Sequence, residues 1–228
     1  MKRLARVVFT LTLLLWVNHG ALAGTRDELR EGKDFVRLTA PLPLAHGDKI
    51  EVLEFFSYGG THSQEFEPYV SAWRAMLPVD VEFHRVPVLF ASRWLELAKV
   101  FYTLEALDME RALSSDVFFA VHHDGLPLFK EQAFLDWAVR KGLDRAKVAE
   151  LYNASTTTDK VNEARSLAQA YNVQVVPMIV VDGKFATNYE RARTHSHFLT
   201  MLDQLIARAR LERAQALESR RNDSPPVR

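Results

Sequence analysis

Cysteine is absent from the 228 residues of this chain. A disulfide therefore cannot stabilise the fold, and no thiolate is present to act as a nucleophile in disulfide exchange. The chain also lacks an excess of positive charge, since 29 lysines and arginines face 29 acidic residues, which disfavours a nucleic-acid-binding protein. Packing must provide the stability, and a hydrophobic content of 48% with 14 phenylalanines is sufficient for one sizeable core.

The first 23 residues have the pattern of a secretory signal peptide. Three cationic side chains occur within the first six residues, residues 7–17 form an apolar stretch that is short for a membrane span, and Ala21-Leu22-Ala23 is a small-x-small cleavage site. We therefore predict an exported protein, cleaved after Ala23, without stable membrane insertion after cleavage. An uncleaved membrane anchor is the alternative. Cleavage removes the three cations and leaves 26 basic against 29 acidic side chains, a net charge of −3.

The rest of the chain shows strand and helix patterns in the order of an α/β fold. Residues 49–56 are typical of a central strand buried on both faces, because β-branched and aromatic residues are almost continuous there. A helix follows, with either Gly60 or Thr61 as its N-cap. Residues 81–86 alternate like a strand, and apolar residues then recur at helical spacing from 93 to 171.

Strand signals return after residue 172. Residues 178–187 contain two short apolar runs around Asp182-Gly183, a dipeptide that favours the type I′ turn of a hairpin. A closing amphipathic helix follows. The predicted parts are a signal peptide (1–23), an N-terminal arm (24–47), an α/β domain formed by 48–90 and 172–210, a helical insertion (91–171), and a charged, flexible tail (211–228).

Three separated features carry a resemblance to a known family. Residues 54–63 read Glu-Phe-Phe-Ser-Tyr-Gly-Gly-Thr-His-Ser, Val176-Pro177 stands just before a strand, and Asp182-Gly183 marks the hairpin after it. Over residues 48–208 the chain resembles the DsbA-like family of thiol:disulfide interchange proteins. The resemblance implies an α/β fold of the thioredoxin type with an inserted all-helical subdomain, and a periplasmic location.

The cysteines of the family's Cys-x-x-Cys motif are replaced in this chain. Gly60 and Ser63 occupy the two cysteine positions, Thr61 lies between them, and His62 keeps the histidine that the family has there. Thiol-disulfide chemistry is thereby excluded, and we expect no catalytic residue at these degenerate positions. A serine-hydrolase use of Ser63 is disfavoured because adjacent residues of a helix point to different sides, so His62 is not placed as its base. We expect His62 to be an exposed polar residue.

Glu54 matches a buried acid that the family uses to help move protons near its thiols. With no thiol to serve, we interpret Glu54 as a buried carboxyl that is protonated or bridged by water. No metal site is predicted, because the pairs His122-His123 and His195 with His197 lack the spacing of a third ligand. No cofactor is predicted either.

Peptide binding is the family function that needs no sulfur. The resemblance implies that the Val176-Pro177 bond is cis and faces the turn at Gly60, and that the backbone beside it pairs with an extended segment of a partner. Phe56, Tyr58 and Met178 are candidates for added apolar surface, and the alternative is that they are core residues. We therefore predict a redox-inactive, chaperone-like binder of extended or unfolded exported polypeptides. The other possibilities are a decayed paralogue without activity and a thiol-independent enzyme that uses the same groove.

Overall fold

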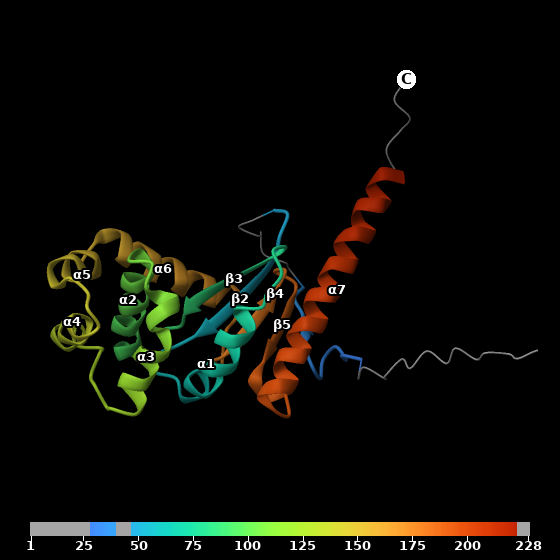
Figure 1. Cartoon of the computed structure of the whole chain (residues 1–228). Helices are drawn as coiled ribbons and strands as arrows, with labels where there is room; N and C mark the ends of the chain where they lie inside the picture. The colour runs from blue at the N-terminus through green and yellow to red at the C-terminus, as the bar shows by residue number, and fades with distance from the viewer. Residues whose placement is uncertain (1–27, 40–46, 223–228) are drawn as a thin grey trace, which may run out of the picture.

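A five-stranded mixed sheet lies at the centre of the molecule (Figure 1). The computed structural model describes residues 28–39 and 47–222. The strands lie in the order β1-β5-β4-β2-β3, in which β2 and β3 are parallel and the other neighbours are antiparallel. Their bounds are β1 Val36–Arg37, β2 Ile50–Phe56, β3 Val81–Pro87, β4 Met178–Val181 and β5 Phe185–Asn188.

The central strand β2 is buried along its whole length, as its nearly continuous apolar sequence predicts. Side chains alternate across a strand, so Ile50 and Val52 pack into one apolar cluster while Leu53 and Phe55 pack into another. One cluster therefore lies on each face of the sheet.

Helices α1 and α7 supply the cluster on one face, whereas α2 to α6 form an insertion whose core continues from the other face (Figure 1). The helix bounds are α1 Thr61–Arg74, α2 Ser92–Ala106, α3 Glu110–His122, α4 Glu131–Arg140, α5 Arg145–Tyr152, α6 Ser155–Ala170 and α7 His195–Asn222. A short 3-10 turn, Tyr189–Arg191, joins β5 to α7. The insertion thus leaves the sheet after β3 and returns to it before β4.

Two local predictions can be compared directly with the backbone. Asp182 and Gly183 have φ angles of 57° and 62°, so the hairpin turn that their sequence predicts is confirmed. Gly60 is the N-cap of α1 and provides no side-chain cap, which decides between the two candidates for that position. The helix consequently begins at Thr61, immediately after the turn that leaves β2.

The N-terminal arm is more ordered than its sequence suggests. Its described part contains β1, which pairs with β5, although its polar, proline-bearing sequence carries no clear strand signal. Phe35 is the reason, because its fully buried ring packs edge-on against Phe185 at 5.6 Å between ring centroids. The predicted signal peptide lies in residues 1–27, which are outside the described residues.

Residues 211–222 of the predicted flexible tail form the last part of α7, which continues as a helix to Asn222, while residues 223–228 lie outside the described residues. Arg210 forms a bidentate pair with Asp80, and Arg213 pairs with the buried Asp182 of the hairpin turn. These ion pairs hold the helix beside the sheet after its last buried residue, Ala209. Among the residues that the structure describes, no helix is long and apolar enough to cross a membrane.

Candidate functional site: a groove beside the degenerate turn

A groove of about 360 Å³ lies where the turn after β2 meets the segment before β4. Both segments were expected to meet, and a Cβ atom placed on Gly60 would lie 3.3 Å from Cγ2 of Val176. The Val176-Pro177 peptide bond is cis. The residues that line the groove are Gly59, Gly60, Thr61, His62, Phe90, Trp94, Val175, Val176, Pro177, Tyr189 and Glu190.

The degenerate turn is held by its own hydrogen bonds. Ser63 is fully buried, and its Oγ accepts a hydrogen bond from the backbone N–H of Ser57 at 3.3 Å. The Ser57 hydroxyl in turn accepts from the N–H of Gly59 at 3.1 Å. His62 is exposed, as expected, and contacts Glu65 at 3.1 Å. The Ser63 hydroxyl therefore serves the turn, and the histidine beside it does not act on it as a base.

Aromatic side chains that the sequence analysis did not identify form the walls of the groove. Trp94 covers Gly59 so closely that a Cβ atom there would lie 2.5 Å from the indole Nε1. Phe90 packs beside Trp94 at 5.6 Å between ring centroids, and on the opposite wall Tyr189 faces His62 at 6.3 Å. The spacing of Gly59 and Trp94 along the chain gives no signal of this contact, because a helix start and a strand end meet only in the folded structure.

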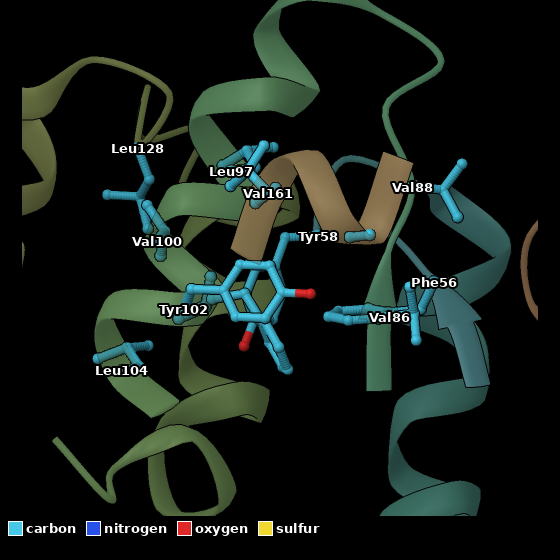
Figure 2. Packing of buried hydrophobic residues seen from close by; sticks show 14 of the residues in the cluster. Phe56, Tyr58, Val86, Val88, Leu97, Val100, Tyr102, Leu104, Leu128 and Val161 are labelled. Carbon is cyan, nitrogen blue, oxygen red and sulfur yellow. The ribbon is translucent and has the colours of Figure 1, made fainter. Parts of the chain in front are cut away.

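Two of the candidate surface residues belong to the core. Phe56 and Tyr58 are fully buried, and their rings pack edge-on at 5.1 Å within the cluster that Figure 2 shows. Neither lines the groove, so their proposed contact with a partner is wrong. Met178 is half-buried in β4 and also lies outside the groove lining. Phe90, Trp94 and Tyr189 supply the apolar surface instead.

Glu54 belongs to a buried charged network. It is fully buried, as expected, and its Oε2 accepts a hydrogen bond from Arg85 Nε at 2.7 Å. Glu67 accepts from a second nitrogen of the same guanidinium at 2.6 Å. Glu110 lies 3.5 Å from Arg85 and 3.1 Å from Arg74. This ion pair was not predicted from the sequence, where we interpreted Glu54 as a carboxyl that is protonated or bridged by water.

Burial raises the pKa of Glu54, although the charge and hydrogen bond of Arg85 oppose this effect. The negative charges of Glu67 and Glu110 act in the same direction as burial. Three carboxyls face two guanidiniums in this network, so the acidic groups outnumber the cations paired with them. Oε1 of Glu54 has no hydrogen-bond partner among the described residues.

The register of the sheet explains why Arg85 reaches this position. Glu54 and Arg85 are directly opposite each other in the parallel pair of β2 and β3. Arg85 is buried, and its guanidinium also lies 4.4 Å from the ring centroid of Phe56. The signal in the sequence is a basic residue inside an apolar strand, which was not connected with Glu54 before the pairing was known.

The paired histidines have separate structural roles. His122 Nε2 lies 2.7 Å from the carbonyl oxygen of Tyr58, so it donates to the turn at the groove. His195 stacks between Tyr69 and Tyr189, at 4.3 Å and 4.7 Å between ring centroids. In the parts of the chain that the structure describes, no group of three histidine, cysteine or acidic residues is placed to hold a metal ion.

Comparisons with known proteins agree with this geometry. The family model described as a DSBA-like thioredoxin domain matches residues 61–199, more than half of the chain. The chain belongs to the DsbA-like thioredoxin family. The predicted α/β thioredoxin fold with a helical insertion is therefore confirmed.

Relatives of this DsbA-like chain cover most of its length. The thiol:disulfide interchange protein DsbA of Pseudomonas aeruginosa is 35% identical over 189 residues, which are 83% of this chain and 90% of that protein. The protein of the same name from Burkholderia cepacia is 32% identical over 202 residues, which are 88% of this chain and 95% of that protein. The crystal structure of Pseudomonas aeruginosa DsbA matches with a TM-score of 0.78 and 36% identity, covering 84% of this chain and 98% of that structure.

Because it has no cysteine, this DsbA-like chain lacks the thiol that the thiol:disulfide interchange named for its relatives requires. Disulfide exchange requires attack by a thiolate on a disulfide sulfur, and the chain has no thiol at any position. The turn that carries the motif nevertheless keeps an ordered hydrogen-bonded geometry beside a groove. A function that uses the groove without thiol chemistry is therefore physically possible.

Proposed function

We propose that this protein is an exported, periplasmic, redox-inactive member of the DsbA-like family that binds extended or unfolded polypeptide in the groove beside Gly60 and Pro177. The observation that supports this proposal is an available backbone edge on an aromatic groove. Within the described part of the chain, the backbone groups of Val175 and Val176 make no hydrogen bond. Their N–H and C=O groups can pair with an added strand, because such pairing requires only backbone groups.

The walls of the groove suit a partner of varied sequence. Phe90, Trp94 and Tyr189 offer large rings that bury apolar side chains without demanding one shape. Backbone pairing provides affinity that is independent of side-chain identity, and the rings favour segments that expose apolar residues. Unfolded polypeptides have both properties, whereas folded proteins expose few unpaired strands. This combination supports a chaperone-like role.

A thiol-independent enzyme receives less support from the geometry. In the described groove no nucleophile lies within hydrogen-bond reach of a base, because Ser63 is buried in the turn and His62 contacts Glu65. A decayed paralogue without activity is separated from the proposed function only by whether the groove binds anything. Binding measurements therefore decide between them.

The experiment compares two exposed phenylalanines. Phe90 lines the groove and is 48% exposed, while Phe119 lies on α3 outside the groove and is 53% exposed. We expect mature protein to bind a fluorescent, permanently unfolded polypeptide in anisotropy titrations, and Phe90→Ala to weaken this binding roughly tenfold, the effect of losing one well-packed aromatic contact. Phe119→Ala should leave the affinity unchanged.

Circular dichroism of both variants verifies that they stay folded. If the wild-type protein shows no saturable binding, the decayed-paralogue alternative is correct. If it binds but Phe90→Ala binds equally well, the groove is not the binding site.

The location is tested separately. The leader pattern of residues 1–23 supports export to the periplasm. Cell fractionation followed by mass spectrometry of the purified protein should find a periplasmic chain that begins at Gly24. A membrane-bound protein with an intact N-terminus would show that the leader is an anchor.

A further inference from the structure

A second groove, of about 330 Å³, continues from the first along the same segment of chain. Phe90 lines both grooves, and Gln174 of the second groove is followed directly by Val175 of the first. Residues 174–176 therefore run past both grooves, whereas the N–H groups of Asn172 and Val173 already bond to carbonyl oxygens of α6. The residues that line the second groove are Val88, Leu89, Phe90, Arg165, Ala168, Gln169, Asn172, Val173 and Gln174.

An extended partner that pairs with Val175 and Val176 and continues past Gln174 reaches both grooves. A strand advances about 3.3 Å per residue, so a peptide of five to six residues spans roughly 15 to 20 Å. Phe90 lines both grooves, so its ring is placed to contact a peptide that occupies the two together.

The linings of the two grooves carry opposite charges. Glu190 is the one carboxylate in the described lining of the first groove and follows Tyr189 on the wall next to α7. Arg165 on α6 is the one cationic side chain in the described lining of the second groove. Both are exposed, and among the described residues neither forms an ion pair. Arg165 donates a hydrogen bond to the amide oxygen of Asn162 at 3.2 Å. Because this partner is neutral, it does not compensate the positive charge of Arg165.

The neighbouring charged groups do not cancel this arrangement. His62 in the first groove contacts Glu65, and Arg191, which follows Glu190, donates to the carbonyl oxygens of Gly32 and Lys33. Arg191 therefore points toward the N-terminal arm. Glu190 also lines a separate pocket with Lys33 and Arg193, but among the described residues neither of these cations forms an ion pair with it.

We propose that the two grooves together select extended peptides with a charge pattern, in which an apolar residue over Phe90 has a basic residue on the Glu190 side and an acidic residue on the Arg165 side. This inference rests on the proposed peptide-binding function and adds the partner's chemistry to it. Exposed pairs of this kind contribute roughly two- to fivefold in affinity each, and salt weakens them. Two such pairs therefore change which peptide the protein prefers, and peptide binding itself does not require them.

The test uses two fluorescent eight-residue peptides of identical composition. Each has a central Leu-Phe pair, and Lys and Glu at the two ends are exchanged between them. We expect the wild-type protein to prefer one peptide by about fivefold or more in low salt and by less in high salt. The double variant Glu190→Lys with Arg165→Glu keeps the net charge and should prefer the other peptide.

A matched control exchanges two exposed charges outside both grooves. Arg111 on α3 and Glu218 on α7 are exposed and line neither groove, so Arg111→Glu with Glu218→Lys should keep the wild-type preference. Equal affinity for the two peptides, or a preference that the groove variant does not reverse, would overturn the inference. If unfolded polypeptide still binds in a Phe90-dependent way, only this inference fails and the proposed function stands. If neither the peptides nor unfolded polypeptide bind, the proposed function fails and this inference with it.

Discussion

Gly60 and Ser63 keep the relative placement that a disulfide needs. A Cβ atom built on Gly60 lies 3.3 Å from the Oγ of Ser63, close to the separation between a Cβ and the partner sulfur in a disulfide. The same Cβ lies 3.3 Å from the Ser57 carbonyl oxygen and from Val176, so the added side chain fits with small local shifts. The loss of the cysteines has therefore left the turn with the geometry to hold them.

We predict that the double change Gly60→Cys with Ser63→Cys forms an intramolecular disulfide on mild oxidation. Mass spectrometry should show the loss of two hydrogens, and free-thiol titration should fall to zero. The position at the N-terminus of α1 favours the thiolate, so the pKa of the thiol introduced at position 60 should be lowered. A pair that stays reduced under air and copper would contradict this geometry. Gly60→Cys alone is the control, since it lacks an internal partner.

Glu54 is the residue at which pH should act on stability. Its pKa is raised in the folded protein, so the folded state binds its proton more tightly than the unfolded chain does. Its contribution is then fully present below the ordinary value of 4.5 and decreases as the pH rises above that value.

We therefore predict that the free energy of unfolding of the wild-type protein falls relative to that of Glu54→Gln as the pH is raised from about 4 to about 8. Urea denaturation of both proteins across this range measures the difference. Parallel curves would show that the carboxyl has the same proton affinity in the folded and unfolded states.

At the scale of elements, the groove depends on how the start of α2 meets the end of β2. Trp94 of α2 rests on Gly59 with no space for a side chain between them, whereas a Cβ on Gly47 would meet no atom within 4 Å. Neither glycine has a positive φ, so space alone distinguishes them. The pair offers a matched test of this contact.

We predict that Gly59→Ala lowers the free energy of unfolding by about 1 to 3 kcal/mol, because the methyl group forces Trp94 away from the turn. The tryptophan emission should shift as the indole moves, and polypeptide binding should weaken. Gly47→Ala should change stability by less than about 0.5 kcal/mol. Urea denaturation and fluorescence spectra measure both variants. Equal stability of the two variants would mean that Trp94 moves freely and that the wall of the groove is not fixed.

Local sequence signals predicted the elements that depend on local chemistry. The apolar run of β2 and the Asp182-Gly183 turn are examples, because burial of a strand and a left-handed turn leave direct signatures in residue type. The wall formed by Trp94 and the ion pair of Glu54 with Arg85 were not predictable, since each depends on packing between distant segments. Phe56 and Tyr58 were predicted as surface candidates for the same reason. The sequence beside a turn does not distinguish an aromatic residue in the core from one on the surface.

At the scale of the whole molecule, stability comes from two apolar clusters and one buried charged network, without any covalent link. The network joins both strands of the parallel pair to α1 and α3. Within the described residues Arg85 pairs with both Glu54 and Glu67, and loss of one partner from a buried ion pair costs about 3 to 5 kcal/mol. Apolar packing, hydrogen bonds and these buried charges therefore hold the sheet and the helices together without a disulfide.

We predict that the mature protein neither reduces insulin disulfides nor oxidises reduced peptides above background, because no thiolate is available. Its thermal midpoint should be the same with and without dithiothreitol. The double change Gly60→Cys with Ser63→Cys is the control, since its midpoint should depend on the reductant. A catalytic rate proportional to the concentration of the wild-type protein would contradict this prediction.

The hydrogen bond from His122 to the carbonyl of Tyr58 joins the end of α3 to the turn at the groove. Because a carbonyl oxygen only accepts, the imidazole Nε2 carries the hydrogen, and its exchange with water is slowed while the bond holds. Any rotation of the helical insertion away from the sheet must break this contact. The Nε2 proton of His122 is therefore a built-in nuclear magnetic resonance signal for opening of the molecule, readable without ligand, label or mutation.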